Sequence, residues 1–344
     1  MYHSSAAPDT YGRVLVGGSK PHVGYVFANV TYPTELSLEA FLPPYMDPRH
    51  DSARPRVLPA PAEVGYGEAT AVKFVIPAGA GAGGEVVWVA AVAPAFATHS
   101  FGMNQRVVEL GVGRVAELDV GVYEAVVAAP PTPGVAPPGY YMWFVVHAGV
   151  PSSSAEWEPT TPSSSFQGEW QLLHASIGVS VMHMQLPPED FVLMFDRTDT
   201  GPSNISLAAL APCAATANGA DRTAHSVLLD LRSNVLHPVP AAHQPVVPCR
   251  AAVVRHDMIL HDGRVLILGG RRQSNLEYFP HADDVAPAPA LTFFPFIDET
   301  TEPDAENNLL AQSSACFGEL VCNVSASATG LTELEIQWTK QLDQ

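Results

Sequence analysis

The chain has 344 residues, enough for two domains, and carries 17 Lys and Arg against 35 Asp and Glu, a formal net charge of −18. This acidic balance repels phosphate and argues against a nucleic-acid partner, while 47% apolar residues supply a core and exclude a disordered polyelectrolyte. The 32 prolines and 26 glycines disfavour long helices and favour short strands joined by turns.

The first residues, MYHSSAAPDT, lack the basic start and apolar run of a signal peptide, so none is expected. The longest apolar stretches lie near Val86–Ala97 and Tyr140–Val150. Pro94 interrupts the first stretch, and both are too short to cross a bilayer. We interpret them as buried strands and expect no membrane partner.

Two segments of the chain are near copies, YGRVLVGGS at residues 11–19 and DGRVLILGG at residues 262–270. Each combines a turn, an apolar strand too short for a helix, and a pair of glycines. A unit of this kind that recurs once per blade is typical of β-propellers. The alternative is two unrelated strands that share a turn.

Between Arg54 and Val150, β-rich runs alternate with turn residues at the spacing of a β-sandwich. The runs are Thr70–Pro77, Glu85–Val92, Arg106–Gly111, Tyr123–Ala129 and Tyr140–His147. The pattern predicts one immunoglobulin-like domain over residues 51–152.

Residues 153–167 are rich in Ser, Thr and Pro, which predicts a linker. Short apolar runs beyond the linker again predict strands, namely Gly178–Met184, Phe191–Phe195, Ser226–Asp230 and Val265–Leu268. In the tail, residues 311–344, the segment Leu331–Trp338 fits either a short amphipathic helix or a strand.

Four long strings precede the linker: MYHSSAAPDTYGRVLVGGSKPHV (1–23), YPTELSLEAFLPPYMDP (32–48), APAFATHSFGMNQRVVEL (93–110) and VAPPGYYMWFVVHAGVPS (135–152). They resemble the plant glyoxal oxidase and galactose oxidase-like family, the copper-radical oxidases. The resemblance is to the C-terminal part of that family. It implies that residues 1–50 are the last blade of a seven-bladed propeller with its connector, and that residues 51–152 are the early-set sandwich domain.

A second set of strings, between residues 168 and 310, resembles the N-terminal propeller blades of the same family. The set comprises GEWQLLHASIGVSVMHMQL (168–186), FVLMFDRTDTGPS (191–203), RTAHSVLLD (222–230), HDGRVLILGGRRQSNLEYFP (261–280) and DAENNLL (304–310). The family order is therefore reversed, and the resemblance implies an all-β chain with an incomplete propeller. A gene model that joins two tandem copies explains this order, and a circular permutant is the rival explanation.

The resemblance implies oxidation of a small aldehyde or primary alcohol by O₂ to give H₂O₂, with copper and a protein radical. Tyr2 and His3 match the family's Tyr-His pair, and His99 matches its second His ligand, on a sandwich loop that reaches the propeller channel. Imidazole and tyrosine suit copper(II). The implied metal ligands are thus Tyr2, His3 and His99, and Tyr2 is also the implied catalytic base. Without the resemblance, His99 fits an ordinary loop residue.

The radical half of that site is altered in this chain. The count back from Asp262-Gly263 places Val254 where the family has its radical tyrosine, and a valine cannot carry a radical. Cys249 is the nearest cysteine, and we interpret it as a buried structural thiol.

Three functions stay open from the sequence. The first is a copper-radical oxidase, and the second is a catalytically dead, secreted module that binds cell-wall carbohydrate. The third is a fusion product without stable function, since the open edges of an incomplete propeller favour aggregation. The resemblance implies an extracellular or cell-wall location.

Overall fold

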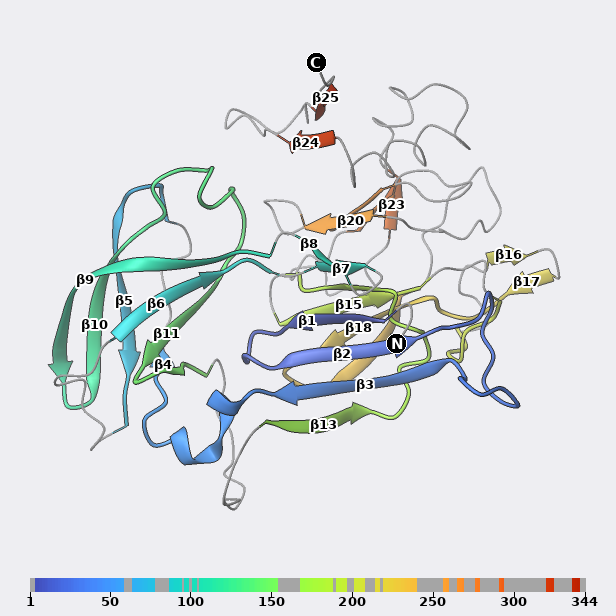
Figure 1. Cartoon of the computed structure of the whole chain (residues 1–344), viewed down its shortest axis with the longest axis horizontal. Coiled ribbons are helices and arrows are strands. Elements are labelled where there is room, and N and C mark those ends of the chain that lie inside the picture. The colour runs from blue at the N-terminus through green and yellow to red at the C-terminus, as the bar shows by residue number, and fades with distance from the viewer. Residues whose placement is uncertain are drawn as a thin grey trace.

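The computed structural model describes residues 4–58, 64–77, 87–94, 96–98, 101–103, 105–153, 168–187, 190–196, 201–207, 214–216 and 219–239, and the backbone of six later strands. The described part of the chain contains strands and no α-helix, which confirms the predicted all-β class (Figure 1). Its only helices are two single 3₁₀ turns, η1 (Pro44–Met46) and η2 (Pro48–His50). Neither of these turns is long and apolar enough to span a membrane.

The first sheet combines three early strands with one from beyond the linker. Its antiparallel order is β1 (Ser5–Pro8), β2 (Val14–Ser19), β3 (Glu35–Leu42) and β13 (Glu169–His174). Along β3, alternate side chains are buried, from Leu36 to Leu42, because successive residues of a strand face opposite sides. On the outer edge of β3, Glu169 lies opposite Leu42. A segment more than a hundred residues away in sequence therefore completes this sheet.

The second sheet has the order β19-β18-β15-β14-β7-β8. Four of these strands follow the linker: β14 (His183–Gln185), β15 (Phe191–Phe195), β18 (Ser226–Asp230) and β19 (Val235–Val239). The other two, β7 (Phe96–Thr98) and β8 (Phe101–Met103), come from the predicted sandwich domain. The predicted strands at 191–195 and 226–230 are confirmed.

The predicted strand Gly178–Met184 is wrong over most of its length, because the chain becomes a strand only at His183. Residues 177–182 are buried but irregular, and Gly178 has a φ of +80°, outside the extended region typical of strands. The apolar side chains of this segment therefore indicate burial rather than strand geometry.

One hydrophobic core joins the two sheets. It combines side chains from the early strands, such as Leu15 and Leu38, with side chains from beyond the linker, such as Val181, Met194 and Leu229. All five are nearly inaccessible to solvent. Neither segment buries these residues alone, so the two parts of the chain form one folded unit.

A buried ion pair also crosses between the two sheets. Lys20, which follows β2, donates from Nζ to both carboxylate oxygens of Asp196 at 2.9 and 2.8 Å. Asp196 directly follows β15, and the two side chains are 1% and 0% exposed. Such a pair must stay intact, because one partner alone would leave an uncompensated buried charge.

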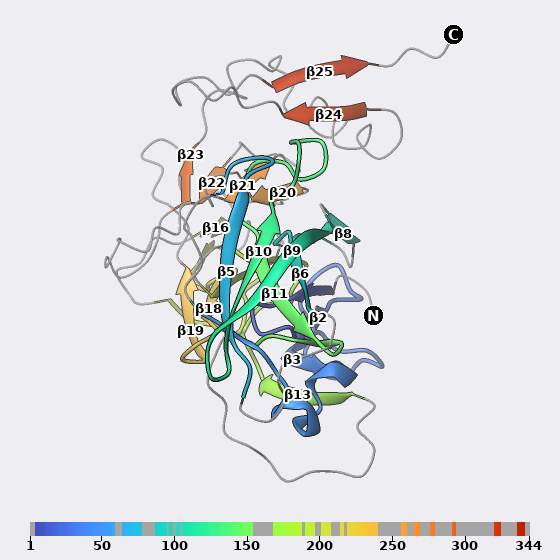
Figure 2. The same cartoon turned by 90° about the vertical axis from the view of Figure 1, so that its left-hand side faces the viewer.

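The predicted sandwich forms one curled sheet in the order β12-β11-β6-β9-β10-β5-β4, turned toward the viewer in Figure 2. The strands are β4 (Arg56–Val57), β5 (Ala69–Val75), β6 (Val87–Val92), β9 (Val107–Asp119), β10 (Val122–Ala128), β11 (Met142–His147) and β12 (Val150–Pro151). β9 pairs with β6 over its first residues and with β10 over the rest. A parallel bridge between Arg56 and Ser153 brings the two ends of the sheet together.

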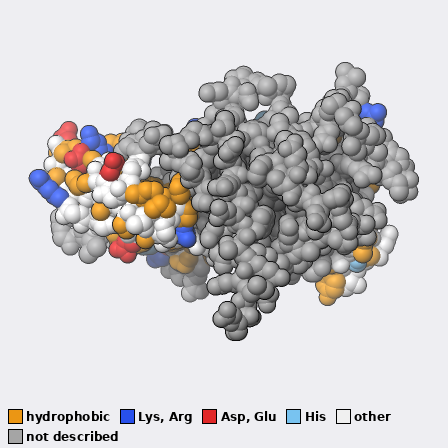
Figure 3. All heavy atoms as spheres, turned by 90° about the horizontal axis from the view of Figure 1, so that it is seen from above, with side chains coloured by type: hydrophobic (Ala, Val, Ile, Leu, Met, Phe, Trp, Pro, Cys, Tyr) orange, Lys and Arg blue, Asp and Glu red, His pale blue; other side chains and the backbone are white. Residues whose placement is uncertain are grey.

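The inner face of this sheet has a core of its own, with Phe74, Val89, Tyr123 and Val145 among its buried residues. On its outer surface, hydrophobic side chains are interspersed with charged ones (Figure 3). β9 continues beyond the predicted run, which ended at Gly111. Its second half is largely exposed, and charged residues there separate apolar ones such as Val115 and Leu118, so it has no continuous apolar run.

Further strands follow in sequence. They are β16 (Ala214–Thr216), β17 (Gly219–Asp221), β20 (His256–Ile259), β21 (Val265–Leu268), β22 (Leu276–Tyr278), β23 (Leu291–Phe293), β24 (Leu320–Val324) and β25 (Ile336–Lys340). Strands β20 to β23 form a third antiparallel sheet of four strands. In the tail, β25 pairs with β24, which favours the strand alternative for that segment.

The two glycines of the first near-copy, Gly17 and Gly18, are required for steric reasons. A Cβ on Gly17 would lie 2.7 Å from Val181 Cγ2, and one on Gly18 would collide with the backbone nitrogen of Val181. Gly18 also has a φ of +76°, where side chains are strained. Only glycine therefore lets the buried segment 177–182 cross β2 this closely.

We expect Gly18→Ala to lower the free energy of unfolding by about 2–5 kcal/mol, because it adds both left-handed strain and a backbone collision. The matched control is Gly67→Ala, since Gly67 has a φ of +70° and no atom within 4 Å of the added Cβ. This control should lose only about 1–2 kcal/mol. Equal losses in urea denaturation would show that the close approach of Val181 is not limiting.

Lys20→Met should destabilise the fold by about 3–5 kcal/mol in urea denaturation, because it leaves the Asp196 carboxylate buried without its cation. The double variant Lys20→Met/Asp196→Leu should recover most of this loss. The control is Lys73→Met, whose side chain is 53% exposed and lies 3.9 Å from Glu124. It should change stability by less than about 1 kcal/mol. A Lys20 effect as small as that of Lys73 would contradict the importance of the buried pair.

Candidate functional site

The hairpin of β7 and β8 lies among strands of three different sheets. β7 pairs with β14 in the second sheet, and it also contacts β1 of the first sheet and β20 of the third. β1 in turn contacts β14 and β8. The hairpin belongs to the sandwich segment of the chain. It therefore places that segment against β1 and β20, which are outermost strands of the two four-stranded sheets.

Two contacts show which ends of these strands meet. The Ser5 hydroxyl, at the start of β1, donates to the Met182 carbonyl oxygen at 2.8 Å. The next residue, His183, pairs with Thr98 at the end of β7. The start of β1 and the end of β7 therefore lie at the same end of this group of strands.

The three predicted ligands, Tyr2, His3 and His99, lie outside the described residues. In sequence, His3 is two residues before the start of β1, and His99 directly follows the end of β7. They therefore flank the two strand ends that meet. Val254 and Cys249 also lie outside the described residues.

Buried polar side chains from the second sheet gather at this same end. His183 begins β14 opposite Phe195, and Phe195 pairs with Ser226, which directly follows His225. His183 and His225 are buried, and the His183 ring stacks on Phe195 with centroids 4.6 Å apart. Within the described ranges, no three His, Cys, Asp or Glu side chains are grouped closely enough to hold a metal ion.

Lys20 and Asp196 extend this polar end toward the first sheet. The Lys20 ammonium lies 5.3 Å from the centroid of the Tyr25 ring, and the Tyr25 hydroxyl accepts a hydrogen bond from Ser180 N at 3.2 Å. The sequence interpretation did not single out Lys20 or Asp196. A signal was present, because each is a charged residue at the end of an apolar strand.

Comparison with known proteins gives matches for the first part of the chain. A family model described as glyoxal oxidase N-terminus matches residues 1–45, and a galactose oxidase-like early set domain matches residues 54–157. These matches confirm the predicted resemblance for residues 1–45 and 54–157 and the immunoglobulin-like character of the sandwich domain, while the resemblance of residues 168–310 stays a prediction.

Curated plant proteins give the same result. The chain is 43% identical over 159 residues to aldehyde oxidase GLOX1 of Arabidopsis thaliana, covering 46% of this chain and 25% of that protein. It is 44% identical over 162 residues to aldehyde oxidase GLOX of Vitis pseudoreticulata, covering 47% of this chain and 30% of that protein. It is 40% identical over 157 residues to the putative aldehyde oxidase Art an 7 of Artemisia annua, covering 44% of this chain and 25% of that protein. The chain therefore spans less than a third of the length of these relatives. No solved structure matches it significantly.

The Ser5 hydrogen bond allows a direct test of how the strand ends are held together. Ser5→Ala leaves the buried Met182 carbonyl without this donor, and we expect a loss of about 1–2 kcal/mol in the free energy of unfolding. The control is Ser37→Ala on β3, which removes a hydroxyl outside this contact and should cost less than about 0.5 kcal/mol. Equal stabilities for wild type and Ser5→Ala in urea denaturation would contradict the contact.

Proposed function

We propose that the chain is a secreted copper-binding protein descended from aldehyde oxidases, in which Tyr2, His3 and His99 hold copper(II) but oxidase turnover is lost. The observation that carries this proposal is the meeting of two strand ends. The Ser5–Met182 hydrogen bond and the Thr98–His183 pairing bring together the points where these residues join the described fold.

The chemistry of the three residues fits copper. Two imidazoles and a tyrosine oxygen are the nitrogen and oxygen donors that copper(II) prefers. In the family that the chain resembles, the copper exchanges electrons with O₂ and with a small aldehyde or primary alcohol. In this chain, His3 and His99 would bind the metal through neutral rings, and Tyr2 would supply an oxygen ligand.

The arrangement of sheets supports a partial propeller. Two four-stranded antiparallel sheets have β1 or β20 beside the hairpin of β7 and β8, and in the second sheet four strands, β14, β15, β18 and β19, extend from that hairpin. We assign residues 1–50 and 168–310 to propeller blades, 51–152 to the sandwich domain, 153–167 to a linker and 311–344 to an unassigned tail. The core shared by Leu38 and Val181 supports a stable folded product rather than a fusion without structure.

The loss of turnover follows from a residue identity. Val254 occupies the position that the resemblance assigns to the radical tyrosine, and an aliphatic side chain cannot be oxidised to a stable radical. A protein with copper ligands and no radical partner has lost one of the two electron acceptors of the reaction. This favours a non-catalytic role in the extracellular space or cell wall, where binding of carbohydrate is the second candidate.

Two glycosylation sequons are compatible with secretion. Asn29, in Asn-Val-Thr, and Asn204, in Asn-Ile-Ser, are both exposed in the structure. An acceptor asparagine must be accessible for the glycan to be attached.

Copper titration of the full chain tests the proposal. We expect one equivalent of copper(II), detected by electron paramagnetic resonance with nitrogen hyperfine structure, and no H₂O₂ from methylglyoxal. His3→Ala and His99→Ala should each weaken binding at least tenfold, because each removes a nitrogen ligand.

The matched control for that titration is His237→Ala, which removes an exposed histidine on β19. It should bind copper like wild type. Equal loss in all three variants, or the absence of nitrogen coupling, would refute the assigned ligands. Rapid H₂O₂ release would refute the loss of turnover.

A further inference from the structure

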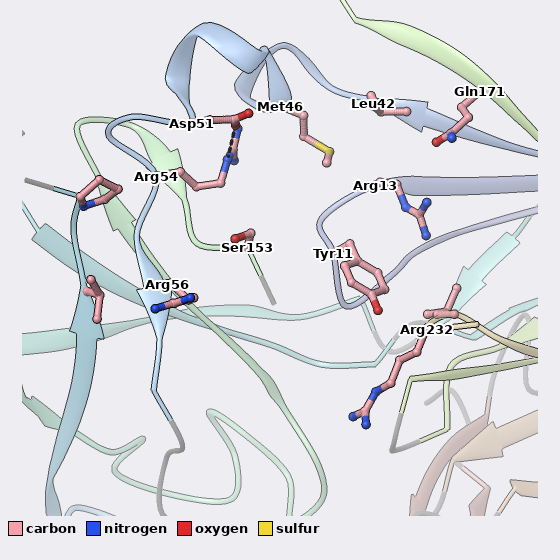
Figure 4. Close-up of a pocket in the computed structure, with 13 residues that line it drawn as sticks. Tyr11, Arg13, Leu42, Met46, Asp51, Arg54, Arg56, Ser153, Gln171 and Arg232 are labelled. Atoms are coloured by element: carbon pink, nitrogen blue, oxygen red, sulfur yellow. Dashed lines mark hydrogen bonds and ion pairs between the residues drawn. The ribbon is translucent and has the colours of Figure 1, made fainter. Parts of the chain in front are cut away.

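An arginine-lined groove of about 600 Å³ lies between the first sheet and the sandwich domain (Figure 4). The arginines in its lining are Arg13, Arg54, Arg56 and Arg232. Three of them are each paired with an aspartate, namely Arg13 with Asp9, Arg54 with Asp51 and Arg232 with Asp190. The positive charges of these three residues are therefore balanced within the fold. A different surface, in the loop between β2 and β3, has apolar groups that the fold leaves uncovered.

The loop between β2 and β3, residues 20–34, places large apolar side chains in water. It extends beyond the ends of both strands in Figure 1. Val23, Phe27 and Tyr32 are exposed, and Tyr32 is 71% accessible to solvent. Large apolar side chains gathered on one exposed loop typically mark a surface that another group covers. This loop is therefore a candidate for such a covering group.

Hydrogen bonds at its base give the loop a defined shape. Val26 N donates to Thr34 Oγ1 at 3.0 Å, and Thr34 N donates to the Val26 carbonyl oxygen at 2.7 Å. Closer to the strands, His22 Nε2 lies 2.9 Å from the Tyr32 carbonyl oxygen. Residues 27–33 therefore form the tip of a closed loop rather than an extended connection.

An aromatic ring at this tip is held in place from one side. The Phe27 ring stacks on the Tyr25 ring, with centroids 5.7 Å apart and an angle of 25° between the planes. Tyr25 is itself anchored to the fold, because its hydroxyl accepts from Ser180 N and its ring lies beside the Lys20 ammonium. Since Phe27 remains 48% exposed, it presents a pre-organised aromatic surface to the solvent.

An acceptor for a covalent sugar lies two residues after this ring. Asn29 is the third residue of Phe-Ala-Asn-Val-Thr (27–31) and begins the sequon Asn-Val-Thr. It is exposed and has a φ of +60°, a left-handed turn conformation that asparagine tolerates better than most residues. The accessible amide and the downstream threonine are what attachment of an N-linked glycan requires.

We propose that Asn29 carries an N-linked glycan whose first N-acetylglucosamine packs on the Phe27 ring. The CH face of the sugar ring is apolar, so this contact would cover surface that is otherwise exposed to water. In the attachment step, the Asn29 side-chain nitrogen bonds to C1 of the sugar, and the bond from C1 to a lipid-linked pyrophosphate breaks. The lipid pyrophosphate leaves, and the nitrogen loses one proton. The proposal rests on the secretion proposed above, because this transfer occurs in the secretory pathway.

The second exposed sequon lacks the features that favour Asn29. The residue two positions before Asn204 is Pro202, so no aromatic ring takes the place of Phe27. The hydroxyl residue of that sequon, Ser206, forms a β-bridge with Thr223 and is fixed in backbone pairing. We therefore expect a larger fraction of molecules to be modified at Asn29 than at Asn204.

Secretion of the full chain from a eukaryotic host, behind a supplied cleavable signal peptide, tests the acceptor. The supplied peptide makes the result independent of the chain's own location and of its copper binding, so each proposal can fail without the other. Mass spectrometry of proteolytic glycopeptides should find an occupancy at Asn29 at least about twofold higher than at Asn204. Asn29→Gln should remove the Asn29 glycan alone. An unmodified Asn29, or equal or higher occupancy at Asn204, would overturn the inference.

Melting temperatures test the contact with Phe27, after an endoglycosidase has trimmed each glycan to its first sugar. At matched Asn29 occupancy, the trimmed protein should melt about 2–4 °C above Asn29→Gln, because the sugar buries part of the aromatic ring. Phe27→Ser should abolish this difference. The control Tyr140→Ser, which removes an exposed ring outside the loop, should preserve it. A difference that persists in Phe27→Ser would refute the packing of the sugar on this ring.

Discussion

The buried contact between Lys20 and Asp196 joins two segments that lie far apart in the chain. Lys20 follows β2 of the first sheet, and Asp196 follows β15, the third strand beyond the linker. Two charges held out of water fix the relative position of their backbones, because any displacement leaves one charge uncompensated. The crossing of Val181 over Gly17 and Gly18, and the addition of β13 to β3, both require that same relative position.

The joined sheets present two different ends. At one end, the start of β1 and the end of β7 meet, and the proposed copper ligands flank them. At the other end, the turn after β1 positions Tyr11 and Arg13 beside the sandwich domain, where the arginine-lined groove lies. A strand of only four residues separates these two ends.

Much of the strand content was predictable, because short apolar runs bounded by turn residues have few other solutions. The runs at Phe191–Phe195 and Ser226–Asp230 coincide with β15 and β18. Gly178–Met184 was misread because burial and strand geometry produce the same apolar composition. The second half of β9 was missed because its apolar residues, such as Val115 and Leu118, are separated by charged residues and lie exposed rather than in a continuous buried run. The candidate ligands came from motif resemblance alone, and their geometry stays a prediction.

The sequence by itself determined the all-β class, the sandwich domain and the likeness to glyoxal oxidase and galactose oxidase-like proteins, because composition, turn spacing and motifs are local properties. Tertiary structure decided which distant strands pair, why two glycines are required in β2, and that Lys20 meets Asp196 across 176 residues. It also decided the grouping of Arg13, Arg56 and Arg232, which no spacing in the chain reveals. Such groupings depend on how separate segments bury a common core, and that is a property of the whole fold.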